Sequence, residues 1–278
     1  MTTRHVMKLH EFCRQKQDRA KPLASASQLQ IHNIASVMLR DAVRAGYLPF
    51  NPASRERIDR PRKVSPPPEA LTLDEARRVL KVAAEQPDYA RWALALYHGV
   101  RQGEALGLER SAVDLEAGVL RLEWQLKKLK EPPRDTMQAR DLGGGYWLLP
   151  PKTVSSRRVQ PLVEPVLSIL REHCARFRPA AATHDLLFRR EDGGPLYPSR
   201  DLKRWRWLLS EAGVSRNVRL HDARHTAATL MLEAGVELHV IQQILGHSSA
   251  AMTQHYSHVS LDLARAAMTR LAGSLASS

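Results

Sequence analysis

The sequence has few cysteines and no long apolar stretch. These two features exclude disulfide-rich proteins, four-cysteine zinc proteins and proteins with a membrane-spanning helix. Its 278 residues include only two cysteines, Cys13 and Cys174, too few for a disulfide framework or a four-cysteine zinc site. A reduced, cytoplasmic setting is therefore expected. No apolar run reaches the roughly 18 residues of a membrane-spanning helix, and the first residues lack the apolar core of a signal peptide. We expect no membrane partner.

Acidic residues are outnumbered by basic ones. The chain has 42 Lys and Arg against 29 Asp and Glu, a formal net charge of +13. Such an excess favours a polyanionic partner such as nucleic acid, although a solvated basic surface would give the same numbers. The excess is uneven, because residues 1–68 hold 13 basic and 5 acidic side chains. This basic N-terminal part is expected to bind DNA.

Prolines divide the chain near residue 66. Three consecutive prolines stiffen the backbone and prevent a helix from continuing, and Thr72 followed by Glu75 forms a capping box that begins a new helix. Before the prolines, apolar residues at helical spacing predict a helix from Ser27 to Ala45. The sequence thus predicts a short helical domain, a Pro-rich linker, a larger domain and a tail, over residues 1–64, 65–70, 71–260 and 261–278.

The larger domain is predicted to be mainly helical. Helices are expected over 72–86 and 88–98, and again from 163 to the end. Alternating residues predict a strand over 118–126, and weaker strands over 144–150 and 157–162, with Lys152 in a turn between the last two. The predicted fold class is therefore mainly α, with a small antiparallel β-sheet in the larger domain.

Several polar residues stand at positions that can carry chemistry, and each also has an ordinary structural explanation. Arg101 lies beside glycines at a helix start, where it can bind a phosphate or simply pair with Glu104. His221 and Arg224 are three residues apart and share a helical face. In a functional site, His221 would be a proton acceptor beside the fixed positive charge of Arg224. The ordinary alternative is that both are solvated side chains at the start of a helix.

Three further positions are individually weaker. Gly246 can cap the preceding helix and leaves His247 at a rigid junction. Tyr256 can act as a covalent nucleophile, although its ordinary pKa of about 10 requires assistance; a core tyrosine is the alternative. Lys152, at the tip of a predicted turn, is by itself most simply a solvated lysine.

The order of these residues is more informative than any one of them. The segments GVRQGEALGL, HDARHTAATL, ILGHSS and MTQHYSH resemble, in this order, the motifs of the tyrosine recombinase (phage integrase) family. The resemblance covers about residues 70–260. It implies a helical catalytic domain with a small sheet, a helical domain ahead of it that completes a clamp around DNA, and strand cleavage and rejoining without metal, ATP or other cofactor.

The resemblance also implies a role for each motif residue. Tyr256 would attack the scissile phosphate to form a 3′-phosphotyrosyl bond. Arg101 and Arg224 would bind the non-bridging oxygens, which suits a group that stays charged and donates in pairs. Lys152 would protonate the leaving 5′-oxygen, and His221 would help to deprotonate the tyrosine. His247 would donate a hydrogen bond to the phosphate, and Glu104 would orient the other active-site residues.

The N-terminal part departs from the usual family pattern. Residues 1–64 resemble the C-terminal part of a core-binding domain, so we expect a short core-binding domain and no arm-type DNA-binding domain. This is expected of either a minimal integrase or a truncated chain. Candidate DNA contacts in this part are Arg40, Arg44, Arg60, Arg62 and Lys63. The tail has apolar residues near helical spacing and would pack either on its own domain or on a neighbouring subunit.

The leading interpretation is a recombinase that integrates or excises phage or mobile-element DNA. Its partners would be double-stranded attachment sites, further copies of the chain in a tetramer, and accessory DNA-bending or directionality factors. A dimer-resolving recombinase of the same family and a catalytically inactive, truncated DNA-binding protein stay open. A metal hydrolase is disfavoured: His221 and His225 have zinc-helix spacing, but Asp222 replaces the expected glutamate.

Overall fold

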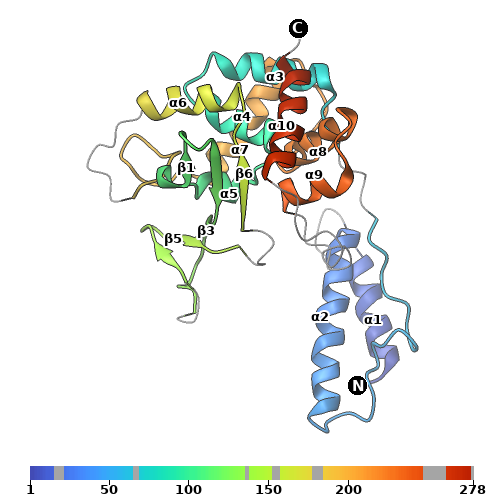
Figure 1. Ribbon diagram of the computed structural model, residues 1–278. Coiled ribbons are helices and arrows are strands. Elements are labelled where there is room, and N and C mark those ends of the chain that lie inside the picture. Colours follow the sequence, from blue (N-terminus) through green and yellow to red (C-terminus); the bar gives the residue numbers. More distant parts are fainter. Residues whose placement is uncertain are drawn as a thin grey trace. The chain divides into compact units, whose positions relative to one another are not determined.

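The computed structural model describes residues 1–15, 22–64, 69–134, 138–151, 157–176, 184–246 and 261–276, which form two units, Met1–Pro67 and Pro68–Ser278 (Figure 1). The first unit contains the helices α1 (Thr3–Arg14) and α2 (Ser25–Arg44). The helices of the second unit are α3 (Leu73–Ala84), α4 (Tyr89–Tyr97), α5 (Gln102–Leu106), α6 (Val166–Arg176), α7 (Pro198–Glu211), α8 (Asp222–Glu233), α9 (Leu238–Leu245) and α10 (Leu261–Ala276), with a short 3-10 helix at Arg110–Ala112. Its strands are β1 (Val113–Asp114), β2 (Val119–Leu122), β3 (Gln125–Lys128), β4 (Arg140–Asp141), β5 (Tyr146–Leu149) and β6 (Arg158–Pro161).

The first unit has a small core. Val6, Leu39 and Ala53 are its buried apolar cluster, and the rings of His10 and His32 hydrogen-bond across the helix pair at 3.0 Å. The predicted helix is present as α2, two residues longer at its start, whereas α1 was not predicted. Several of the apolar residues of α2 whose spacing predicted the helix face solvent, namely Ile34, Val37 and Met38. Helical spacing identified the element but not its buried face.

The second unit is built around α4, in which every residue after the partly buried Tyr89 is buried. Helices α3, α6 and α8 pack against α4, and Trp92 of α4 stacks on the fully buried Trp205 of α7. The capping box predicted at the start of α3 is present, since Thr72 and Glu75 exchange hydrogen bonds. None of the described helices has the length and hydropathy of a membrane span.

The strands form two small antiparallel sheets, ordered β1-β2-β6 and β3-β5-β4. The mainly helical fold with small antiparallel β-structure is thus confirmed, but two details of the prediction are wrong. The strand expected over 118–126 is two strands in different sheets, β2 and β3, separated by two residues. The strands flanking Lys152 do not pair with each other, because β5 pairs with β3 and β4 while β6 pairs with β2.

The register explains both errors. Leu122 pairs with Arg158 and Gln125 pairs with Leu149, so two residues on one side of the ladder face eight, 150–157, on the other. A chain that carries six extra residues between two pairing positions must leave the ladder, which interrupts the sheet at that point. Lys152 belongs to this connection.

The tail folds as α10 and packs on its own unit. It contacts α3, α4, α8, α9 and β6 and buries Ala267, Met268 and Leu271. In Figure 1 it lies across α8 and α9. Of the two arrangements that the sequence left open, the structure has the intramolecular one.

Candidate active site

Arg101 precedes the short helix α5 and is held there by Glu104. The Glu104 carboxylate accepts from the Arg101 backbone N–H at 3.0 Å and from its guanidinium Nη1 at 2.7 Å. The ion pair that was the ordinary explanation for this motif is therefore present. It also fixes the guanidinium at the helix start, with Nη2 3.4 Å from the Gly246 carbonyl oxygen. About a third of the Arg101 side chain stays exposed.

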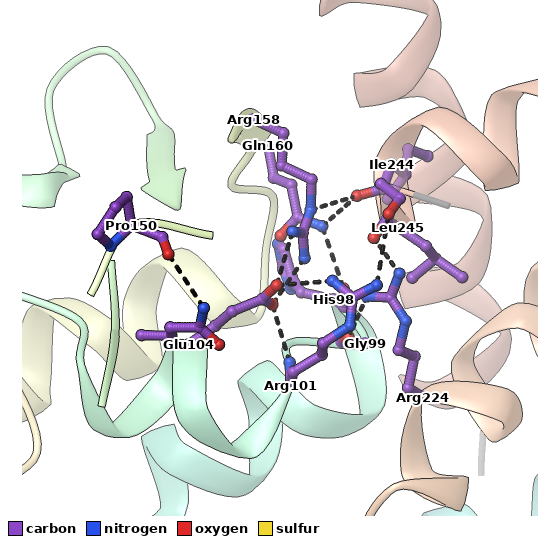
Figure 2. Close-up of polar contacts among 12 residues, drawn as sticks. His98, Gly99, Arg101, Glu104, Pro150, Arg158, Gln160, Arg224, Ile244 and Leu245 are labelled. Atoms are coloured by element: carbon purple, nitrogen blue, oxygen red, sulfur yellow. Dashed lines mark hydrogen bonds and ion pairs between the residues drawn. The ribbon is translucent and has the colours of Figure 1, made fainter. Parts of the chain in front are cut away.

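Glu104 also binds Arg158 of β6, which is a second arginine fork on the same carboxylate (Figure 2). Arg158 Nη1 and Nη2 lie 3.0 Å from the two Glu104 oxygens, and its Nε donates to the Ile244 carbonyl at 2.9 Å. The Arg158 and Glu104 side chains are only 6% and 5% exposed. Four charge-assisted hydrogen bonds thus converge on one buried carboxylate, and they lower the Glu104 pKa to about 2 against the opposing effect of its burial.

Arg224, in the first turn of α8, reaches the same place from the other side. Its Nη1 donates to the Gly99 carbonyl at 2.9 Å, and its Nη2 donates to the Leu245 carbonyl. Ile244, Leu245 and Gly246, the last turn and cap of α9, therefore have their carbonyls bound by Arg158, Arg224 and Arg101 respectively. Since these carbonyls have no partner within the helix, the three guanidinium groups act as its C-terminal cap.

Two glycines make this approach possible. Gly246 ends α9 in the left-handed conformation, with φ of 66° and ψ of 53°, as the sequence predicted. Gly99 has φ of +59°, and a Cβ there would lie 2.5 Å from a side-chain methyl of Leu245. Only glycine meets both requirements at residue 99 without strain, so its carbonyl can reach Arg224.

The charges of the cluster do not balance. Arg101, Arg158 and Arg224 contribute three positive charges and Glu104 one negative charge. Burial, followed by the repulsion of Arg101 and Arg158, lowers the pKa of Arg224 to about 9. This is the expected consequence of removing a cation from water beside like charges. An anion placed against Arg101 and Arg224 would relieve that repulsion.

His221 lies at the N-terminus of α8, next to the two arginines. Burial, then the nearby His225, then Arg224 lower its pKa, so the imidazole is neutral near pH 7 and can accept a proton. Its ring is 5.5 Å from that of His225 in an edge-to-face arrangement. Among the residues that the structure describes, no three His, Cys, Asp or Glu side chains are grouped as metal ligands.

The structure therefore brings Arg101, Glu104 and Arg224 together, with His221 beside them. Lys152, His247 and Tyr256 lie outside the described residues. The candidate DNA contacts of the first unit, Arg40, Arg44, Arg60, Arg62 and Lys63, are all exposed, and Arg44 lies 3.8 Å from Asp41.

Arg158 and Gln160 were not identified from the sequence. The fully buried Gln160 side chain donates to the carbonyls of His98 at 3.1 Å and Ile244 at 2.6 Å. A signal was present: Arg158, Gln160 and Leu162 alternate, so a strand would place all three on one face. Two polar residues on the same face as a core leucine indicate buried partners.

The fold resembles that of solved DNA integrases. The Tn1549 transposon integrase in complex with circular intermediate DNA is 22% identical, with a TM-score of 0.72, and the match covers 96% of this chain and 85% of that one. A lambda integrase tetramer bound to a Holliday junction is 18% identical, with a TM-score of 0.58 and coverage of 91% and 66%. The architecture is thus that of an integrase.

Sequence comparisons define the family. The sequence model of the phage integrase family matches residues 69–262. An integrase of Saccharopolyspora erythraea is 29% identical over 85% of this chain and 64% of its own length, and a XerC-like tyrosine recombinase of Caldanaerobacter subterraneus subsp. tengcongensis is 29% identical over 82% and 61%. The chain belongs to the phage integrase family and spans a little over three fifths of these curated relatives.

Proposed function

We propose that the protein is a tyrosine-type site-specific DNA recombinase. The observation that carries the proposal is the excess positive charge at the end of α9. There Arg101 and Arg224, from opposite sides, present forks beside a single carboxylate that Arg158 already shares. A phosphodiester is the DNA group that such a pair binds best, because each guanidinium can donate two parallel hydrogen bonds to its oxygens.

In the proposed reaction the Tyr256 hydroxyl oxygen attacks the scissile phosphorus and the bond from phosphorus to the 5′-oxygen breaks. His221, neutral because of its lowered pKa, takes the tyrosine proton. Lys152 gives a proton to the leaving 5′-oxygen. Arg101, Arg224 and His247 stabilise the negative charge of the transition state. Attack by a 5′-hydroxyl on the phosphotyrosyl bond then rejoins the strands, and no external energy source is needed.

The proposed biological role is the integration or excision of phage or mobile-element DNA. Its support is the likeness to proteins described as integrases. Relatives described as XerC and XerD tyrosine recombinases support dimer resolution as the second candidate. In either role the proposed partners are double-stranded recombination sites in the cytoplasm, copies of the chain in a tetramer, and accessory DNA-bending or directionality factors. The exposed Arg40, Arg44, Arg60, Arg62 and Lys63 are proposed to contact DNA phosphates.

Covalent trapping tests the chemistry. Nicked duplexes that tile the DNA flanking the gene let a cleaved fragment diffuse away, so that a protein–DNA adduct accumulates and is seen on a denaturing gel. We expect an adduct with the wild type in the presence of EDTA and none with Tyr256→Phe at unchanged DNA affinity. Arg224→Ala should slow the reaction by about 10²–10³-fold, the usual value of one charge-stabilising donor.

The other outcomes identify the alternatives. Salt-sensitive DNA binding without an adduct would indicate an inactive DNA-binding protein. An adduct with Tyr256→Phe would exclude that tyrosine as the nucleophile, and cleavage that EDTA abolishes would favour a metal hydrolase. The position of the trapped site, at an element boundary or at a chromosomal or plasmid locus, would distinguish integration from dimer resolution.

A further inference from the structure

Arg158 is the residue through which three separate parts of the proposed active site meet. It lies on β6, six residues after Lys152. Its fork binds Glu104, which in turn holds the backbone and guanidinium of Arg101, and its Nε binds the carbonyl of Ile244, three residues before His247 (Figure 2). We propose that Arg158 is a positioning residue that aligns Arg101 on the scissile phosphate, through Glu104 and the end of α9; this rests on the proposed function.

The contacts are of a kind that fixes position. A guanidinium is planar, and three of its N–H groups are used here on two partners from distant parts of the chain, so the distance and angle between β6 and the end of α9 are set together. Gln160 supplies a second connection between the same strand and the same helix end, by donating to the carbonyls of Ile244 and His98. His98 completes the link, because its Nε2 lies 3.2 Å from the Pro161 carbonyl.

The burial of this network argues for a function beyond stability. A buried ion pair contributes little net stability compared with well-packed apolar residues of similar size. A strand and a helix end could be joined more simply by apolar contact. The arrangement instead links Arg158 to Glu104 and, through it, to Arg101, so any shift of β6 also moves a phosphate-binding group.

Arg158→Lys tests the proposal, because lysine keeps the charge but cannot bind both Glu104 oxygens and the Ile244 carbonyl at once. The assay is single-turnover adduct formation on a nicked duplex carrying the trapped site, at saturating DNA. Displacement of catalytic groups by about 1 Å typically costs about 10²-fold. We expect the rate constant to fall by about 10²-fold, while the final amount of adduct and the DNA affinity stay within twofold of the wild type.

A merely structural residue would behave differently. It would reduce the fraction of folded protein, and hence the final amount of adduct, without changing the rate constant of the folded remainder. The matched control is Arg216→Lys, which weakens another arginine fork, on Glu75, whose contacts do not include the arginine cluster. It should lower the melting temperature without changing the rate constant.

Gln160→Met, nearly isosteric, should show a smaller fall in the rate constant and serves as the second variant if Arg158→Lys does not fold.

The outcomes separate this proposal from the proposed function. No adduct with the wild type overturns both. A normal wild-type reaction with an unchanged rate constant in Arg158→Lys and Gln160→Met, or with only a lower final amount of adduct, overturns the positioning role alone.

Discussion

Replacing Glu104 by glutamine should destabilise the second unit by about 3 kcal/mol at pH 7, and by progressively less as the pH falls toward 2. The change keeps the size of the side chain but removes its charge. Arg101, Arg158 and Arg224 then stand together without a carboxylate. Removing one partner of a buried pair is costly because the remaining charges are left uncompensated.

The magnitude follows from the pKa of Glu104. Four hydrogen bonds from two arginines hold this pKa at about 2, compared with 4.5 for an unperturbed glutamate. Each pKa unit corresponds to about 1.4 kcal/mol, so the ionised form is favoured in the folded protein by roughly 3 kcal/mol. Because the folded pKa is depressed, this stability is present above pH 4.5 and disappears as the pH falls to about 2.

Urea denaturation of the wild type and Glu104→Gln, followed by tryptophan fluorescence at several pH values, measures the difference. All five tryptophans lie between residues 92 and 207, so the signal reports on the second unit. Groups that titrate equally in both proteins cancel. Glu109→Gln is the control: its ion pair with Arg140, which is 45% exposed, should contribute at most about 1 kcal/mol.

Two results would refute this reasoning. A Glu104→Gln difference below about 1 kcal/mol at pH 7 would mean that the three arginines do not depend on the carboxylate. A difference in unfolding free energy above about 1 kcal/mol that stays constant down to pH 2 would mean that Glu104 acts through its shape and hydrogen bonds rather than through its charge.

Three further predictions concern other parts of the second unit. Gly99→Ala should lower the melting temperature markedly more than Gly213→Ala, because both have positive φ but only the Cβ at residue 99 would meet a leucine methyl, at 2.5 Å; equal shifts would exclude the clash. Thr226→Val should cost about 1–3 kcal/mol in urea denaturation, since the buried hydroxyl accepts from the Leu71 N–H at 2.9 Å and an unpaired buried donor carries that penalty; a loss below 0.5 kcal/mol would contradict it. Burial lowers the pKa of His98 to about 4, so the unfolded chain binds a proton at this histidine at a higher pH than the folded protein does. Between pH 6.5 and pH 4 the free energy of unfolding of the wild type should therefore fall by roughly 3 kcal/mol more than that of His98→Gln. Parallel pH profiles of the two proteins would refute this.

The sequence predicted most of the helices correctly because their signals are local. The Thr72 capping box, the apolar spacing and the glycine at residue 246 each act within a few residues, and the structure has the corresponding start and end. The same locality explains the errors. An alternating run over 118–126 indicates strand, but its partners are chosen by distant segments, and those segments belong to two sheets.

The exposed face of α2 is a similar case. Ile34, Val37 and Met38 recur at helical spacing, but the other helix of the first unit packs on a different side and buries His32 and Leu39. Periodicity identifies a helix with an apolar stripe, and it does not say which neighbour covers that stripe.

The order of its motifs by itself determined the family of this protein and the residue types that are proposed for its chemistry. Only the tertiary structure decided that Arg101 and Arg224, 123 positions apart, meet on consecutive carbonyls of α9. It alone showed that Arg158 joins them through Glu104 and that the tail packs on its own unit. The physical reason is that residue type and local spacing fix what a side chain can donate or accept, whereas its partner depends on long-range packing that no local pattern encodes.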